Sequence, residues 1–202
     1  MSGSHRIFAL GAALALSLGG AATSEAADAT GEIVGTVTAG VPKHRANTVV
    51  YVKNAGQGTS TATVKMDQKG MMFTPRVLPI QKGTTVEFSN SDPVGHNVFT
   101  PDGDKYDLGT WPKGESRKYT FKSPGVFRQL CKVHDDMIAY IVVVDTKYFA
   151  VSDKNGDFKL PALPPGKYTL SFWHEKLGAK DVTVDVVAGK PTKIDVPLEK
   201  KP

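Results

Sequence analysis

The side chains best suited to metal chemistry lie in two short stretches near the middle of the chain. Cys131, His134 and Met137 share the run Cys-Lys-Val-His-Asp-Asp-Met, and His96 lies upstream in Gly-His-Asn-Val-Phe. Two imidazoles, a thiolate and a thioether form the donor set of a trigonal His₂Cys copper site with a weak axial Met. Cys131 is the only cysteine in the chain, so it has no partner for an internal disulfide. The spacing therefore predicts one type 1 copper ion that exchanges single electrons.

Such a site needs ligands held by rigid strand ends. We expect Cys131 to end a strand over residues 125–130, and a second strand over 138–144 to leave the ligand loop. His96 follows an earlier strand that ends at Asn90. Because the loop between the last two strands is short, its three ligands must converge.

The rest of the chain has the pattern of an all-β protein. Short alternating apolar stretches, such as 84–88, 168–172 and 182–186, are separated by turns rich in Gly, Pro and Asp. The run Ile-Ala-Tyr-Ile-Val-Val-Val over 138–144 is nearly continuous and predicts a strand buried on both faces. We expect a Greek-key β-sandwich together with a second, smaller β-sandwich.

Residues 64–145 resemble the small cupredoxins. The Cys-x₂-His-x₂-Met spacing is similar to that of amicyanin, and the upstream His96-Asn97-Val98-Phe99 run resembles the same family's first ligand motif. The resemblance implies a blue copper domain in which His134 is the solvent-edge ligand that passes electrons. It also implies that Asn97 ties the two ligand loops together through hydrogen bonds.

The ligand loop departs from the amicyanin pattern at two positions. Asp135 and Asp136 stand where the family carries apolar residues that help to form a docking patch. One interpretation is a solvated turn whose carboxylates accept backbone N–H groups. The other is a local negative charge that steers a basic redox partner, against the basic average of the chain.

The C-terminal part resembles the carboxypeptidase regulatory-like (transthyretin-like) module, with Ser-Asp-Lys-Asn-Gly-Asp-Phe over 152–158 and Leu-Pro-Pro-Gly-Lys-Tyr over 163–168. The opening strands of that module are missing just before Lys147, and similar runs lie at 31–52 instead. We therefore expect the cupredoxin to be inserted into the module, because two isolated strands need a sheet. The competing hypothesis is a larger cupredoxin with an N-terminal extension and an appended domain. The predicted divisions are 1–26, 31–57, 63–145 and 147–202.

The first 26 residues read as a secretory signal. His5 and Arg6 precede a short apolar run, and Ser24-Glu25-Ala26 offers a cleavage site after Ala26. The apolar run is too short to span a bilayer, which disfavours a retained membrane anchor. We expect export to the periplasm. The net charge of +5 is mild, and no block of basic residues indicates nucleic acid.

Several other residues have possible metal roles that we set aside. The Asp-Lys-Asn-Gly-Asp run at 153–157 predicts a hairpin turn rather than a calcium loop. His174 is expected at a strand end, and His44 in a polar loop without a neighbouring partner. Core packing is expected for Met66, Met71 and Met72, against the alternative of Cu(I) capture by thioethers.

The sequence thus favours a periplasmic electron carrier that is not an enzyme and that serves a redox protein partner, a cytochrome or a dehydrogenase. The main alternative is copper storage, delivery or sensing. Multicopper oxidases and nitrite reductases need further histidines, often as His-x-His, and the chain has none of these pairs. A cysteine hydrolase using Cys131 and His134 fits a β-loop poorly. Adhesion or carbohydrate binding by the transthyretin-like part remains open.

Overall fold

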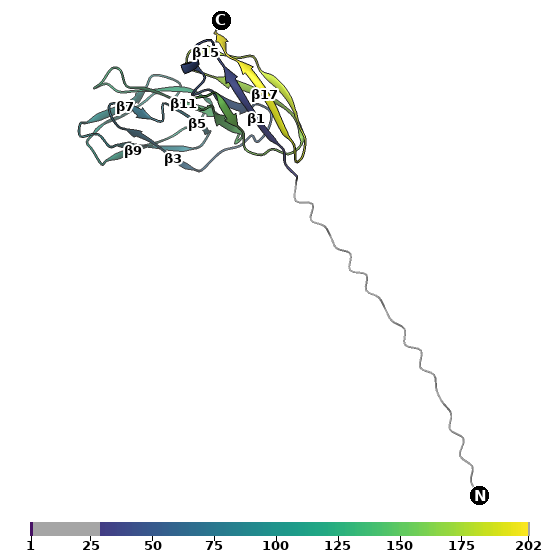
Figure 1. The fold of residues 1–202 in the computed structure, drawn as a ribbon. Helices are drawn as coiled ribbons and strands as arrows, with labels where there is room; N and C mark the ends of the chain where they lie inside the picture. The colour runs from purple at the N-terminus through teal and green to yellow at the C-terminus, as the bar shows by residue number, and fades with distance from the viewer. Residues whose placement is uncertain (2–28, 202) are drawn as a thin grey trace.

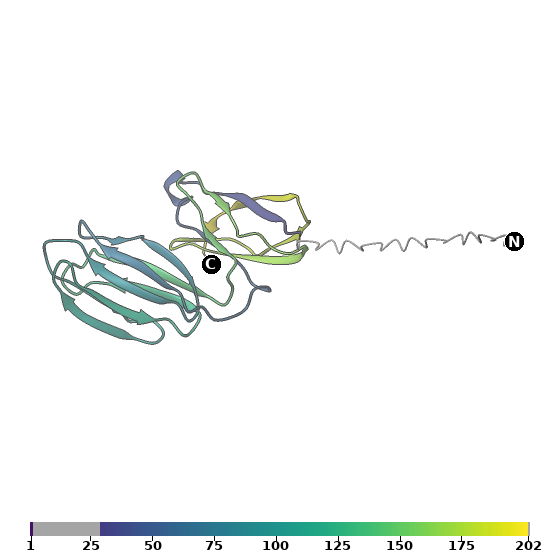
Figure 2. The same cartoon turned by 90° about the horizontal axis from the view of Figure 1, so that it is seen from below.

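The computed structural model describes residues 29–201 and Met1. Residues 2–26 of the expected export signal lie outside the described residues, so cleavage after Ala26 stays a prediction. Within the described part, the chain forms strands and a single 3-10 turn, η1 (Pro42–His44), and no helix is long and apolar enough to cross a membrane. The expected all-β class is confirmed, and the strands gather into two units that lie side by side (Figures 1 and 2).

The first unit, here called the inner sandwich, has one four-stranded and one five-stranded sheet, in the orders β4-β3-β6-β9 and β5-β11-β10-β7-β8. Its strands are β3 (Thr63–Gln68), β4 (Phe73–Thr74), β5 (Val77–Gln81), β6 (Thr85–Asn90), β7 (His96–Thr100), β8 (Tyr106–Trp111), β9 (Ser116–Thr120), β10 (Gly125–Leu130) and β11 (Ile138–Val144). β3 runs parallel to β6, and β5 runs parallel to β11. The chain therefore crosses between the sheets, as a β-sandwich requires.

The core of the inner sandwich follows from alternation along the strands. In β6, Val86 and Phe88 are fully buried while their neighbours are partly exposed. In β11, Ala139, Ile141 and Val143 belong to the same buried cluster. Because successive side chains in a strand point to opposite faces, each sheet turns one apolar face toward the other. This packed core holds the strand ends that carry the candidate ligands.

The second unit, here called the flanking module, is built from both ends of the described chain. Its strands are β1 (Glu32–Thr38), β2 (Val49–Val52), β12 (Phe149–Val151), β13 (Asp157–Lys159), β14 (Gly166–Trp173), β15 (Leu177–Gly178), β16 (Val182–Val186), β17 (Pro191–Pro197) and β18 (Glu199–Lys200). They form sheets in the orders β13-β1-β17, β12-β2-β14-β16 and β15-β18. β1 lies parallel to β17 along its whole length, from Glu32 opposite Pro191 to Thr38 opposite Pro197.

The inner sandwich interrupts the flanking module between β2 and β12. β2 lies between β12 and β14, so both of its edges pair with strands that follow the sandwich in sequence. At the junction, the two crossing segments run side by side: Gln57 forms a bridge with Thr146, and Thr146 Oγ1 donates to the Ala55 carbonyl at 2.6 Å. Neighbouring entry and exit points let one domain sit within another without distorting either. This pairing is the contact pattern that the insertion hypothesis requires.

β11 is shared between the two units, which explains its continuous apolar run. Its odd-numbered residues face the core of the inner sandwich, whereas Val142 and Val144 join a second buried cluster with Val49 and Val77. The Tyr140 ring lies on this outer face, 5.2 Å from the ring of Trp173 between centroids. The flanking module therefore covers the outer face of β11 and of the neighbouring β5, and β11 is buried on both faces as predicted.

The Asp-Lys-Asn-Gly-Asp run forms a turn, but it is not a simple hairpin. Asp153 Oδ1 accepts the backbone N–H groups of Asn155 and Asp157 at 2.8 and 2.9 Å. The strands on either side, β12 and β13, belong to different sheets. The carboxylate thus accepts the turn's own N–H groups, as in an Asx turn. The turn carries the chain from one sheet to the other.

Candidate metal centre

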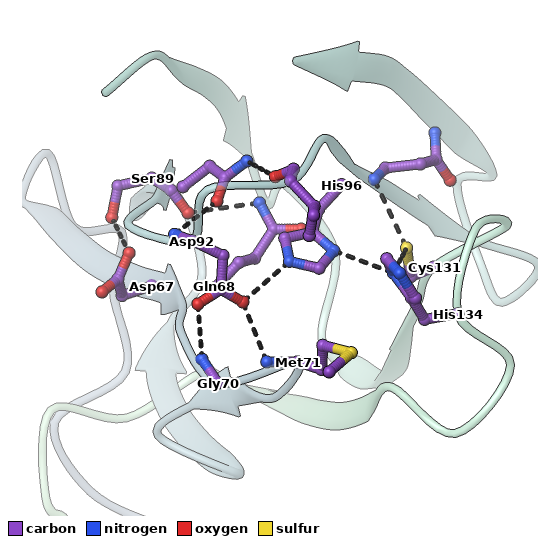
Figure 3. A network of polar contacts seen from close by, with 12 residues as sticks. Asp67, Gln68, Gly70, Met71, Ser89, Asp92, His96, Cys131 and His134 are labelled. Carbon is purple, nitrogen blue, oxygen red and sulfur yellow. Dashed lines mark hydrogen bonds and ion pairs between the residues drawn. The ribbon is translucent and has the colours of Figure 1, made fainter. Parts of the chain in front are cut away.

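Three of the four predicted ligands converge at one end of the inner sandwich. His96 begins β7, Cys131 follows β10 directly, and His134 lies in the turn before β11. The Nδ1 atoms of His96 and His134 are 3.0 Å apart, and Cys131 Sγ lies 4.0 Å from His134 Nδ1. All three donor atoms lie within 4.8 Å of one another. Figure 3 shows the two imidazole rings and the thiol turned toward a common point.

The local fold explains why the loop residues meet. β10 and β11 are antiparallel, and their last pair joins Leu130 to Ile138, which leaves only the ligand loop between them. Within that loop, the Met137 N–H donates to the His134 carbonyl at 3.1 Å, which tightens the turn. β7 pairs with β10 on the other side, through Leu130 and Phe99, so His96 arrives beside the loop from a different part of the chain.

Asn97 joins the two ligand-bearing segments. Its backbone N–H donates to Cys131 Sγ at 3.4 Å, and its side-chain Oδ1 accepts the N–H of Lys132 at 3.3 Å. Its Nδ2 donates to Asp107 Oδ1 at 2.7 Å and to the Gly109 carbonyl at 2.9 Å. The bridging role that the resemblance implies for Asn97 is therefore confirmed. These bonds hold the thiol and the start of β7 in a fixed relation.

Burial differs sharply among the predicted ligands. His96 is fully buried, and Cys131 and Met137 are 4% and 1% exposed. His134 alone is partly exposed. Met137 belongs to the same buried cluster as Cys131, so its thioether lies in the core at the base of the loop. Solvent thus reaches this group of side chains through one imidazole edge.

Asp92 is a polar neighbour of the site that the sequence analysis missed. His96 Nε2 lies 2.8 Å from Asp92 Oδ2, which leaves Nδ1 as the ring nitrogen that faces His134 and Cys131. The carboxylate also accepts the backbone N–H groups of Gly70 at 2.6 Å and Met71 at 2.8 Å. The pKa of Asp92 is lowered to about 2, mainly by the hydrogen bond from the Met71 N–H and further by the Gly70 N–H and the His96 ring. Burial of the carboxylate opposes this shift. An Asp four residues before the histidine was the only signal in the sequence.

The donor set and its spacing fit a copper ion. A transition metal lies about 2.0–2.1 Å from imidazole nitrogen and about 2.3 Å from thiolate sulfur, so its ligand atoms are separated by roughly 3–4 Å. The Nδ1–Nδ1 and Sγ–Nδ1 distances of 3.0 and 4.0 Å agree with this spacing. Thiolate, thioether and imidazole are soft or intermediate donors that suit copper and disfavour magnesium or calcium. His96, Cys131 and His134, with Met137 buried nearby, are the residues that could hold the ion.

The expectation for the other methionines is correct for one residue and wrong for two. Met66 is fully buried in the inner sandwich, but the side chains of Met71 and Met72 are 58% and 62% exposed. Both lie in the reversal between β3 and β4, where Gly70 and Met71 have φ values of 63° and 55°. The chain turns too tightly there for these side chains to reach the core. In Figure 3, Met71 lies on the same side of the site as His134.

The expectation that His44 has no neighbouring partner is wrong. Its ring centroid lies 5.9 Å from that of His174, which follows the end of β14 as expected. His174 Nδ1 accepts the N–H groups of Lys176 and Leu177 at 3.2 and 3.1 Å, and burial lowers the pKa of this histidine. Among the described residues, this pair belongs to no group of three potential metal ligands.

Two models of known protein families match parts of the chain. Residues 60–144 match the family model for copper binding proteins of the plastocyanin/azurin family, and residues 138–199 match that for the carboxypeptidase regulatory-like domain.

Solved structures with similarity to the chain include three copper proteins. A Cu-containing nitrite reductase from Thermus scotoductus SA-01 is 27% identical, with a TM-score of 0.40 and coverage of 46% of this chain and 25% of that one. The present chain therefore spans a quarter of the reductase. A purple cupredoxin from Nitrosopumilus maritimus is 21% identical, with a TM-score of 0.38 and coverage of 40% and 99%. A Cu(I) amicyanin variant is 19% identical, with a TM-score of 0.39 and coverage of 47% and 98%. This chain combines a copper-binding domain of the plastocyanin/azurin family with a carboxypeptidase regulatory-like domain.

Proposed function

We propose that this protein is an exported, periplasmic electron carrier with one type 1 copper ion, held by His96, Cys131 and His134 with Met137 as the axial ligand. The observation that carries the proposal is the convergence of the three donor atoms within 4.8 Å of one another. When bound, copper supplies a one-electron Cu(II)/Cu(I) couple. The protein residues supply a fixed and largely buried ligand set.

The burial of the ligands favours a carrier over an enzyme. His96 and Cys131 are closed off from solvent, and Met137 is buried in the same apolar cluster as Cys131. A catalytic metal site keeps a coordination position open for substrate. Strand ends and the Asn97 bonds hold the ligands in place, which favours a centre that changes little between oxidation states. These features support electron transfer without substrate chemistry.

The partly exposed edge of His134 is the proposed route for electrons. Exposed apolar side chains lie on the segments beside the two histidines and on the nearby turn: Met71, Met72, Val94 and Val133. Asp135 and Asp136 are exposed on the same loop as His134. An apolar contact surface with local negative charge suits a transient redox partner that carries a basic rim. A cytochrome or a dehydrogenase with such a rim is the proposed partner.

Copper titration of the mature protein tests the proposal. We expect an intense visible band and a narrow copper hyperfine splitting in EPR at one equivalent of Cu(II), because a thiolate ligand supplies the charge-transfer transition. Cys131→Ser is the matched control: it removes the thiolate but keeps a side chain of similar size, so the colour should vanish while the circular dichroism spectrum is retained. A colourless wild-type protein, or a Ser variant that stays blue, would overturn the assignment.

Copper handling is the second candidate, and the exposed thioethers of Met71 and Met72 favour it. Thioethers select Cu(I), and these two lie on the turn that binds Asp92. Reduction of the loaded protein in the presence of a Cu(I) chelator separates the two functions. A carrier should keep its copper through repeated cycles, whereas a delivery protein should release it on reduction. Loss of copper in the first cycle would move copper handling ahead of electron transfer.

A further inference from the structure

A buried carboxylate stands directly behind His96. Asp92 Oδ2 lies 2.8 Å from His96 Nε2, and the two side chains are 10% and 0% exposed. Figure 3 shows Asp92 between the His96 ring on one side and the turn at Gly70 and Met71 on the other. The carboxylate therefore faces the ring nitrogen that points away from His134 and Cys131.

The surrounding backbone holds Asp92 in this position. Gly70 and Met71 each donate an N–H to one carboxylate oxygen, at 2.6 and 2.8 Å. The Asp92 N–H donates to Asn90 Oδ1 at 2.9 Å, and Asn90 Nδ2 donates to the carbonyls of Val94 and Trp111 at 2.8 and 3.0 Å. Each carboxylate oxygen thus has a donor, and the segment that leads into His96 is braced at both ends.

Asp92 acts through His96 rather than as a ligand. It is absent from the described group of donor atoms that lie within 4.8 Å of one another. An ionised carboxylate that accepts the Nε2 proton fixes the ring tautomer, so the Nδ1 lone pair is directed toward the other donors. The same contact increases the electron donation of the imidazole, and its negative charge favours the more positive state of a bound metal.

We propose that Asp92 is a positioning residue of the centre, which sets the tautomer of His96 and lowers the reduction potential of the bound copper. This inference rests on the proposed electron-transfer function. An amide oxygen in the place of Asp92 Oδ2 would still accept the His96 Nε2 proton but would add no charge. The charge and the orientation are therefore separable by substitution.

Asp92→Asn tests the contribution of the charge, because the side chain keeps its shape and one acceptor oxygen for the His96 ring and the Met71 N–H, while it loses only the bond from the Gly70 N–H. The expected result is an upward shift of the reduction potential measured by voltammetry, with the visible band retained. We expect the ratio of Cu(II) to Cu(I) affinity to fall by about tenfold, which corresponds to about 59 mV for a one-electron couple. Asp195→Asn is the control, since Asp195 is exposed on β17 of the flanking module and its loss changes the net charge equally. A shift in Asp92→Asn no larger than that in the control would overturn the proposal.

Nitrogen NMR of the metal-free wild-type protein gives a second test that does not depend on a folded variant. The proposal requires a proton on His96 Nε2, with slow exchange and a downfield shift from its bond to Asp92. A ring protonated at Nδ1 alone would overturn the proposal, whatever the behaviour of the variants. If the wild-type protein fails to form a blue centre, the electron-transfer function fails separately, and the tautomer result still decides the role of Asp92 in the apoprotein.

Discussion

The shared strand β11 makes a strong prediction about stability. Val142 and Val143 are adjacent, each is 3% exposed, and they face opposite sides of the five-stranded sheet. Val143 packs in the inner sandwich, whereas Val142 packs against the flanking module. If the two units unfold together, Val142→Ala should therefore cost as much free energy of unfolding as Val143→Ala.

The magnitude follows from the carbon atoms removed. Each substitution deletes two methyl-sized groups from a buried site, at about 0.8 kcal/mol per group. A partly unrelaxed cavity raises the total to about 2 kcal/mol. For a protein of this size, that corresponds to a melting temperature lower by about 4–8 °C. The losses in free energy of unfolding should agree within about 1 kcal/mol between the two variants.

Urea unfolding, followed by circular dichroism and by the visible band of the copper-loaded protein, measures the free-energy cost of each of the two substitutions. The two probes should give coincident transitions in the wild type and in both variants, because unfolding of either unit exposes one face of β11. A cost below about 0.5 kcal/mol for Val142→Ala, beside a full cost for Val143→Ala, would refute the reasoning, since surface substitutions fall in that range. The interface would then be a weak contact between independent domains.

Two further predictions concern the ligand loop and its support. Met137→Leu should keep copper but raise the reduction potential, because the weak axial ligand tunes it; a drop or no change in voltammetry would mean that Met137 is not axial. The pKa of Asp107 is lowered from 3.8 to about 2, chiefly by Lys132 and then by the Gly109 N–H and Asn97. Its carboxylate therefore stabilises the fold above about pH 4 and loses that effect as the pH falls toward 2. Asp107→Asn should thus destabilise the apoprotein at pH 7 by less than about 1 kcal/mol, since the Asp107 side chain is exposed, and by clearly less at pH 2, where about half of the carboxylate is protonated in the folded state. Urea midpoints at the two pH values check this, and an equal difference at both would contradict it.

Local patterns were sufficient to predict the ligand loop and most strands. Cys131, His134 and Met137 lie within one short connection between antiparallel strands, so their proximity follows from sequence spacing alone. The alternation in β6 and the continuous apolar run of β11 reflect burial on one face and on two faces, and both are legible in the residue types. Predictions of this kind succeed because they depend on a few neighbouring residues.

Predictions failed where a contact depends on distant segments. Asp92 and the Met71 N–H meet only because β3 and β6 pair in parallel, and nothing in either stretch alone indicates the bond. Met71 and Met72 are expected in the core because they lie beside predicted strands, yet the turn with positive φ at Gly70 and Met71 leaves both exposed to solvent. His44 and His174 approach each other only because β2 pairs with β14 within the flanking module.

The sequence by itself determined the types and order of the donor groups, the all-β class and the two kinds of domain, because these follow from composition and short-range periodicity. Only the tertiary structure decided that His96 Nδ1 lies 3.0 Å from His134 Nδ1 and that Asp92 stands behind the His96 ring. Strand pairing and sheet packing set those relations across tens of residues. The register of the sheets brings these distant side chains together, and no local pattern encodes that register.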